Sequence, residues 1–341
     1  MTTDETTVKF GRKDYQTDQE VRWCPGCGDY SILAAIQLLF AELGLRPENQ
    51  VFVSGIGCAA RFPYYMETYG IHSIHGRAPA VATGVALARP DLDVWVIGGD
   101  GDMLSIGGNH LIHALRRNVG LNIVMFNNQI YGLTKGQYSP TSEVGKITKS
   151  SPLGSLDQPF NPVSVALGAE ATFVGRTHDM DRKHMMETLR RAYAHNGASF
   201  VEIYQNCNVF NDGAFEAITA KDSRADMLID LKHGEPVRFG ADMEKGVVLN
   251  QFGECEIVDV ADVGEDRLLV HDEHRDDPTL AFAISRLSDA PTMPTPVGVF
   301  RDVNRPAYED QVQMQLAAAS ERGGPGDLHS LIGSGSTWTV E

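Results

Sequence analysis

Between about residues 30 and 205 the sequence alternates short apolar runs with segments of helical periodicity, and this alternation constrains the fold more than any other feature. Runs rich in Val, Ile and Phe, ended by Gly, Asn or turn residues, predict buried strands at 51–55, 94–98, 121–126, 171–174 and 199–204. Apolar residues at helical spacing predict helices at 31–43, 80–88, 108–117 and 182–195. Strands that alternate with helices indicate an α/β fold with a doubly wound, mostly parallel sheet. Ligands of such sheets bind at the carboxyl ends of the strands.

The same pattern divides the chain into three predicted parts. Residues 1–20 form an N-terminal arm, 21–212 the ligand-binding α/β domain, and 213–341 an acidic, irregular C-terminal extension with a hairpin around 247–258. We expect the extension to cover the domain or a subunit interface. Residues 134–160 are rich in Ser, Thr, Pro, Gly and Lys and have no strong periodicity. A loop of this length inside a compact domain is usually functional.

Charge and composition exclude several classes of function. The net charge of −16 argues against a nucleic-acid partner, because phosphate binding requires excess Lys and Arg. No apolar run approaches the roughly 20 residues that cross a bilayer, so we expect no membrane partner. Residues 1–13 are polar and acidic and do not resemble a signal peptide, which predicts a cytoplasmic protein. Five cysteines in a reducing compartment are more often metal ligands or catalytic groups than disulfides.

A Gly-Asp-Gly turn directly follows the predicted strand 94–98, and an Asn-Asn pair ends the next strand after 25 intervening residues. Asp100 and Asn128 would offer carboxylate and amide oxygens at one edge of the sheet. With the backbone carbonyl of Ile130, these oxygens suit Mg²⁺. Gly99 and Gly101 would let the backbone approach a diphosphate, whose charge the predicted helix N-terminus near 106–108 would stabilise. The pattern predicts a magnesium–diphosphate site; ordinary strand–helix turns are the alternative.

Four cysteines occupy positions that the predicted sheet brings to one edge. Cys24 and Cys27 form a C-x₂-C loop, whereas Cys58 and Cys207 each follow a predicted strand. Four thiolates suit either zinc or an iron–sulfur cluster. Two isolated single ligands favour the cluster, because structural zinc usually takes two close pairs, but zinc stays open. A thioredoxin-like pair would leave two of these cysteines unexplained, and Cys255 is interpreted as a small core residue.

Six ordered motifs carry a family resemblance: WCPGCGD, SGIGC, HGRAPAVATG, GGDGD, NNQIYGLTKGQYSPTS and EIYQNCN. Over residues 20–240 they resemble the β subunit of 2-oxoacid:ferredoxin oxidoreductases, most closely those that act on 2-oxoglutarate. The resemblance implies that one [4Fe–4S] cluster is bound by Cys24, Cys27, Cys58 and Cys207. It also implies that thiamine diphosphate is lined by Ile56, Gly57, Cys58, Ala59, His75, Gly99, Gly101, Asp102, Gly132 and Leu133.

The resemblance further implies a reaction and its partners. The enzyme would decarboxylate 2-oxoglutarate oxidatively to succinyl-CoA and CO₂, with coenzyme A as co-substrate and with electrons passed through the cluster to ferredoxin, or would run the reverse carboxylation. Thiamine enzymes need a Glu near the aminopyrimidine, on a second α/β domain, and the sequence after residue 212 shows no second α/β pattern. That Glu is expected from an α subunit in an α₂β₂ assembly. The alternatives are pyruvate or a branched-chain 2-oxo acid as substrate, or a non-catalytic zinc-binding protein of the thiamine fold.

A dicarboxylic substrate requires a cation for its distal carboxylate. Lys135, within the segment 130–137, or Arg61 could provide this cation as substrate-binding residues. The alternatives are a solvated loop lysine for Lys135, and a surface or partner-contacting arginine for Arg61.

Overall fold

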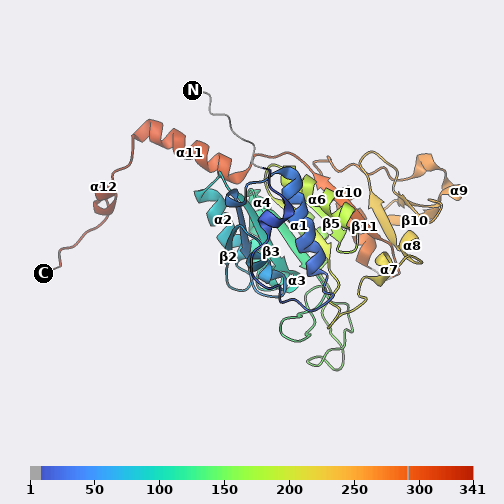
Figure 1. Cartoon of the computed structure of the whole chain (residues 1–341). Coiled ribbons are helices and arrows are strands. Elements are labelled where there is room, and N and C mark those ends of the chain that lie inside the picture. The colour runs from blue at the N-terminus through green and yellow to red at the C-terminus, as the bar shows by residue number, and fades with distance from the viewer. Residues whose placement is uncertain (1–8, 290–291, 341) are drawn as a thin grey trace.

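The computed structural model describes residues 9–289 and 292–340, and at its centre lies an eight-stranded sheet with helices on both faces (Figure 1). The first eight residues of the predicted N-terminal arm lie outside the described residues. The strand order is β2-β1-β3-β4-β6-β5-β11-β7, and every pair is parallel except β5–β11. The strands are β1 (Gln50–Ser54), β2 (Tyr69–His72), β3 (Asp93–Gly99), β4 (Asn122–Asn127), β5 (Phe173–His178), β6 (Ser199–Tyr204), β7 (Leu228–Leu231) and β11 (Thr295–Asp302). The predicted α/β class with a mostly parallel sheet is confirmed.

The helices that cover the sheet form two layers. On one face lie α1 (Asp29–Leu43) and α6 (Arg182–Ala194); on the other lie α2 (Ala78–Ala88), α4 (Gly108–Arg117), α5 (Pro162–Gly168) and α10 (Thr279–Ser285). The remaining helices are short or peripheral: α3 (Asp100–Leu104), α7 (Glu216–Thr219), α8 (Arg224–Met227), α9 (Val260–Val263), α11 (Tyr308–Gly323) and α12 (Leu328–Gly333). The four helices and five strands predicted between residues 30 and 205 are all present, with ends shifted by at most a few residues.

Each face of the sheet has its own apolar core, because successive residues of a strand point to opposite faces. In β1, Val51 and Val53 pack into the core beneath α2 and α4, whereas Phe52 packs into the core beneath α1 and α6. In β3, Val96 packs into the core beneath α2 and α4, and Trp95 packs into the core beneath α1 and α6. Both faces are buried, so these strands are continuous apolar runs. This explains why the sequence pattern located them.

The C-terminal extension contributes to the main sheet, which the prediction of an irregular segment did not foresee. Strand β11 pairs antiparallel with β5, and β7 pairs parallel with β11. β7 is only four residues long, and β11 contains Pro, Gly and Arg, so neither strand appears as a continuous apolar run in the sequence. A separate three-stranded sheet contains β8 (Arg238–Phe239), β9 (Lys245–Leu249) and β10 (Cys255–Asp259). The hairpin predicted around 247–258 is confirmed as β9–β10.

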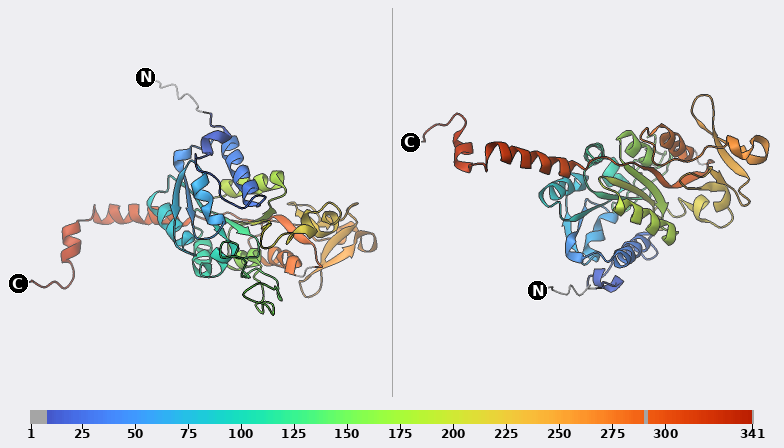
Figure 2. Two further views of the ribbon diagram at one scale, coloured as in Figure 1. Left: turned by 60° about the horizontal axis from the view of Figure 1, so that its bottom comes forward. Right: turned by 90° about the horizontal axis from the view of Figure 1, so that it is seen from above.

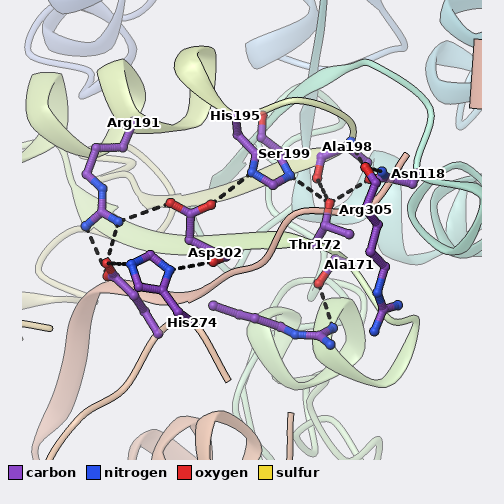
Figure 3. Close-up of polar contacts among 12 residues, drawn as sticks. Asn118, Ala171, Thr172, Arg191, His195, Ala198, Ser199, His274, Asp302 and Arg305 are labelled. Carbon is purple, nitrogen blue, oxygen red and sulfur yellow. Dashed lines mark hydrogen bonds and ion pairs between the residues drawn. The ribbon is translucent and has the colours of Figure 1, made fainter. Parts of the chain in front are cut away.

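A polar network fixes the end of β11 against the α/β core (Figure 3). The Asp302 carboxylate accepts hydrogen bonds from His195 Nδ1 at 2.9 Å and from the Arg191 guanidinium at 3.3 Å. The other ring nitrogen of His195 lies 2.8 Å from the Thr172 hydroxyl, which donates to the Asn118 side chain at 2.6 Å. This chain of bonds connects β11 to α6, to the start of β5 and to the end of α4. The extension is therefore anchored by polar contacts as well as by strand pairing.

The last two helices project away from the body of the protein (Figures 1 and 2). At the base of α11 the Glu309 carboxylate accepts the backbone N–H of Gly120 at 3.0 Å. Beyond this anchor the residues of α11 and α12 are not buried. Within the described residues no helix has the length and apolarity that a bilayer crossing requires.

Candidate functional site

A cavity of about 1150 Å³ lies at the carboxyl ends of the central strands. Its walls come from the segments that follow β1, β3 and β4 and from the loop 134–160, which is green in Figure 1 and hangs beneath the sheet. Ligand cavities in proteins commonly measure about 300–1,000 Å³, so this one has room for a cofactor and a substrate. It is lined by all the residues predicted to contact thiamine diphosphate: Ile56, Gly57, Cys58, Ala59, His75, Gly99, Gly101, Asp102, Gly132 and Leu133.

Asp100 lies at the start of α3 and lines this cavity. Only 2% of the residue is exposed. The hydroxyl groups of Ser139 and Thr141 donate to its Oδ2 at 2.5 and 2.6 Å. Burial raises the pKa of Asp100, while these hydrogen bonds act in the opposite direction. Within the described part of the chain no basic side chain pairs with this carboxylate. A buried carboxylate with only neutral partners fits the binding of a hard cation such as Mg²⁺.

The other two predicted magnesium ligands, Asn128 and Ile130, lie directly after β4 and line the same cavity. Between them Gln129 adopts a left-handed conformation with φ of 55°, which turns the chain across the edge of the sheet. The Asn128 side chain donates from Nδ2 to Gln205 Oε1 at 2.9 Å, and its Oδ1 accepts the backbone N–H of Ile130 at 3.2 Å. These two bonds direct the amide oxygen of Asn128 toward the turn 128–130 and its amide nitrogen toward Gln205. The donor set fits the magnesium–diphosphate prediction.

Asn127, the first residue of the Asn pair, has a supporting role. Its Nδ2 donates to the buried Glu202 carboxylate at 2.7 Å, and its Oδ1 accepts a hydrogen bond from Thr141 at 2.9 Å. The single hydroxyl proton of Thr141 is shared between Asn127 Oδ1 and Asp100 Oδ2, so polar contacts run without a break from Glu202 to the predicted metal ligand. Sequence reasoning missed Ser139 and Thr141, because the course of a long loop does not follow from its periodicity.

Asp102 organises the turns around the cavity. Its Oδ1 accepts from His75 Nδ1 at 2.6 Å, from the Gly76 N–H at 2.8 Å and from the Ile56 N–H at 3.1 Å. With Nδ1 engaged, the Nε2 atom of His75 is the ring nitrogen left for a ligand in the cavity. A Cβ at Gly55 would lie 1.8 Å from Asp102 Oδ2, so this position requires glycine for space.

The two glycines of the Gly-Asp-Gly turn meet different surroundings. A Cβ at Gly99 would have no neighbour closer than 3.8 Å, as expected for backbone that faces a ligand. A Cβ at Gly101 would lie 2.2 Å from the ring of Tyr131, whose hydroxyl donates to the Gly101 carbonyl at 3.1 Å. Gly101 is therefore required by packing against Tyr131, a reason that the sequence alone did not provide.

The structure brings together the three segments that carry the predicted cluster cysteines. A Cβ at Gly132 would lie 3.5 Å from Cys58 Sγ and 3.7 Å from Cys207 Sγ, so these two sulfurs are within about 7 Å of each other. Trp23, next to Cys24, donates its indole N–H to the Cys58 carbonyl at 2.8 Å. The loop 24–28 is joined to the segment after β6 by the bond from the Gly28 N–H to the Asn206 carbonyl, 3.2 Å.

The surroundings of these thiols oppose their ionisation. Burial raises the pKa of Cys58 to about 12, and burial together with the nearby Asp29 raises the pKa of Cys27. A cation is what would keep such thiols ionised. Among the described residues no three cysteine sulfurs all lie within 4.8 Å of one another. A zinc ion with bonds of about 2.3 Å would hold its sulfur ligands about 3.8 Å apart, an arrangement that no three of the described sulfurs have.

The predicted substrate-binding cations lie outside the main cavity. Arg61 lines an adjoining cavity of about 600 Å³, which shares Ile56, Gly57 and Leu133 with the main one. Its Nε donates to the Tyr65 hydroxyl at 3.1 Å. Lys135 is exposed and lines neither of these two cavities. It has a φ of 82°, a conformation that is unfavourable for a residue with a side chain and that is often found at functional turns.

A further group of possible metal ligands lies in the C-terminal extension. The ligand atoms of His233, Glu273 and His274 are within 4.8 Å of one another. Arg191 already donates to both oxygens of Glu273, at 2.8 and 3.1 Å, so the charge of this carboxylate is compensated by a guanidinium. The group is better described as part of the network that anchors β11.

Comparison with known proteins identifies the family. The model of the thiamine pyrophosphate enzyme, C-terminal TPP binding domain, matches residues 55–203. The 2-oxoglutarate oxidoreductase subunit KorB of Mycobacterium tuberculosis is 60% identical over 331 residues, which cover 96% of this chain and 88% of that protein. The β subunit of 2-oxoacid:ferredoxin oxidoreductase 1 of Aeropyrum pernix is 45% identical over 202 residues, or 59% of this chain and 64% of that one. The chain belongs to the β-subunit family of 2-oxoacid oxidoreductases.

A solved structure supports the same family across nearly the whole chain. The 2-oxoglutarate:ferredoxin oxidoreductase of Magnetococcus marinus, with 2-oxoglutarate, coenzyme A and succinyl-CoA bound, aligns with a TM-score of 0.75 and 32% identity, covering 98% of each chain. The alignment includes the extension beyond residue 240, where the motifs had ended. The family resemblance inferred from the motifs is confirmed.

Proposed function

We propose that this chain is the β subunit of a 2-oxoglutarate:ferredoxin oxidoreductase, which converts 2-oxoglutarate and coenzyme A to succinyl-CoA and CO₂, or catalyses the reverse carboxylation. The observation that carries the proposal is the 60% identity to the Mycobacterium tuberculosis subunit over 96% of the chain. The related Magnetococcus marinus enzyme has 2-oxoglutarate, coenzyme A and succinyl-CoA bound. The main cavity, which is lined by the proposed magnesium ligands Asp100, Asn128 and Ile130, supports the same function.

In this proposal the residues after β3 and β4 hold the cofactor. Asp100, Asn128 and the Ile130 carbonyl would bind Mg²⁺, and Gly99 offers open backbone to the diphosphate. Thiamine diphosphate supplies the electron-sink chemistry that decarboxylation of a 2-oxo acid requires. His75, oriented by the bond from its Nδ1 to Asp102, would present Nε2 toward the cavity as an acceptor and so position the bound molecules.

Cys24, Cys27, Cys58 and Cys207 would bind one [4Fe–4S] cluster that passes electrons to ferredoxin. Cys58 belongs to both sites, since it lines the main cavity and its sulfur lies near that of Cys207. The short path from cavity to cluster supports single-electron transfer between them.

The proposed partner is an α subunit in an α₂β₂ assembly. The acidic residues that line the cavity are Asp100, Asp102 and Asp157. The Glu that thiamine enzymes place near the aminopyrimidine is expected from the α subunit, as is the rest of the pyrimidine site. Cytoplasmic location stays a prediction from the sequence.

The test is to purify the chain with its α subunit and to measure iron, sulfide, zinc and viologen reduction. We expect about four irons per β chain, a brown complex, and reduction that depends on coenzyme A and is faster with 2-oxoglutarate than with pyruvate. A colourless complex with stoichiometric zinc would contradict the cluster assignment. Preference for pyruvate or a branched-chain 2-oxo acid would leave the family intact and reject the proposed substrate.

Lys135 and Arg61 are proposed to bind the distal carboxylate of 2-oxoglutarate when the α subunit completes the site. Lys135→Ala should raise the KM for 2-oxoglutarate about tenfold and leave pyruvate turnover unchanged, because only the dicarboxylate needs the cation. Lys149→Ala is the matched control, since Lys149 is an exposed lysine of the same loop. Equal effects of Lys135→Ala on both substrates would reject its role in specificity.

A further inference from the structure

The Gln205 side chain joins the proposed magnesium site to the proposed cluster. Gln205 directly follows β6 and is 1% exposed. Its Oε1 accepts from Asn128 Nδ2 at 2.9 Å, and its Nε2 donates to Cys27 Sγ at 3.3 Å and to the Asn206 carbonyl at 2.5 Å. The backbone N–H of Gln205 also donates to the Asn127 carbonyl at 2.9 Å, which fixes the start of the side chain against β4.

These partners leave only one orientation for the Gln205 amide. Its NH₂ group has two hydrogens, and a sulfur and a carbonyl oxygen accept them. Its oxygen faces the NH₂ group of Asn128, a donor. The reversed amide would place oxygen against the sulfur and the Asn206 carbonyl, and NH₂ against NH₂. The contacts therefore define the orientation, because the reversed form loses the hydrogen bonds to Asn128 and to the Asn206 carbonyl.

We infer that Gln205 is a positioning residue with two roles: it orients the metal ligand Asn128, and it raises the reduction potential of the cluster through its hydrogen bond to Cys27. The inference rests on the proposed function, because both metal groups belong to it. With Asn128 Nδ2 held by Gln205, the amide oxygen of Asn128 is the atom presented to the cation. Residues that orient a metal ligand in this way typically change metal affinity 10–100-fold when they are replaced.

The second role follows from charge. Reduction adds one electron to the cluster, so the thiolate sulfurs become more electron-rich. An N–H that donates to one of these sulfurs stabilises the reduced form more than the oxidised form. Loss of this donor should therefore lower the midpoint potential. One glutamine would thus act on both the cofactor that releases electrons and the group that accepts them.

The experiment compares Gln205→Met and Gln205→Glu in the complete complex with the α subunit at pH 8, with Gln313→Met on exposed α11 as control. Gln205→Met removes the donor and the acceptor without adding charge. We expect the apparent Kd for Mg²⁺ in the presence of thiamine diphosphate to rise about tenfold. We also expect the equilibrium constant for cluster reduction to fall up to tenfold. For one electron this lowers the midpoint potential by up to 59 mV, which an EPR-monitored redox titration measures. Gln205→Glu should lower the potential and keep Mg²⁺ affinity, because its carboxylate still accepts from Asn128.

The outcomes separate the inference from the proposed function. A wild-type complex without an iron–sulfur EPR signal on reduction would contradict the proposed function itself. A wild-type signal with an unchanged midpoint in Gln205→Glu would overturn the tuning role. Unchanged Mg²⁺ affinity in Gln205→Met would overturn the positioning role. If Gln205→Met does not assemble, Gln205→Leu, which also removes the donor without adding charge, tests both the midpoint potential and Mg²⁺ affinity in its place.

Discussion

The ion pair between Arg176 and Glu202 lies in the centre of the sheet, and both side chains have 0% exposure. Arg176 Nε donates to Glu202 Oε2 at 2.6 Å, and Asn127 donates to Oε1 at 2.7 Å. Arg176→Met would remove the cationic partner and leave the Glu202 carboxylate buried with the Asn127 donor. Removal of one partner of a buried pair costs about 3–5 kcal/mol, a large part of the roughly 5–15 kcal/mol that stabilises a typical protein.

Urea unfolding of the purified chain, followed by tryptophan fluorescence and circular dichroism, measures this loss. The double variant Arg176→Met with Glu202→Gln should recover much of the lost free energy of unfolding, because the uncompensated charge is then absent. Arg190→Met is the matched control. Arg190 pairs with Glu42 and Glu187 at the surface, where such pairs contribute about 0–1 kcal/mol. The reasoning fails if Arg176→Met is no more destabilising than Arg190→Met, or if the double variant recovers nothing.

Three further predictions concern the site and its support. Asp100→Asn should reduce thiamine-dependent viologen reduction on the order of 100-fold or more by weakening Mg²⁺ binding, measured against added Mg²⁺. Gly101→Ala should destabilise the protein by about 1–3 kcal/mol, because its Cβ would lie 2.2 Å from the Tyr131 ring; an unchanged melting temperature would contradict this. Burial lowers the pKa of His178 to about 4, so the unfolded chain binds more protons between pH 6.5 and 4. As the pH is lowered from 6.5 to 4, the free energy of unfolding should decrease by up to about 3 kcal/mol. The decrease should be smaller in His178→Asn.

Several parts of the fold could be predicted from the sequence because they depend on local patterns. Strands β1, β3, β4, β5 and β6 are buried on both faces and therefore appear as continuous apolar runs. Strand β2, which was not predicted, is an edge strand with mostly exposed side chains and so lacks that signature. Strands β7 and β11 were missed because β7 has only four residues and β11 contains Pro296, Gly298 and Arg301, which interrupt the apolar run.

The predicted site residues came together for a reason that the sequence already contains. Asp100, Asn128 and Cys58 each follow a strand, and parallel strands end at one edge of the sheet, so the topology brings these residues together. Lys135 could not be placed in this way, because it belongs to a loop whose course no periodicity specifies.

The fold class and the family could be predicted from spacing along the chain, and the predicted ligand residues come from the same spacing. The neutral side chains that contact the predicted ligand residues became visible in the three-dimensional structure alone. Thr141 reaches Asp100 from a long loop, Tyr131 packs on Gly101, and Gln205 contacts both Asn128 and Cys27. These contacts depend on how loops and strand ends meet in space, and hydrogen bonds form wherever donors and acceptors meet, irrespective of their separation in sequence.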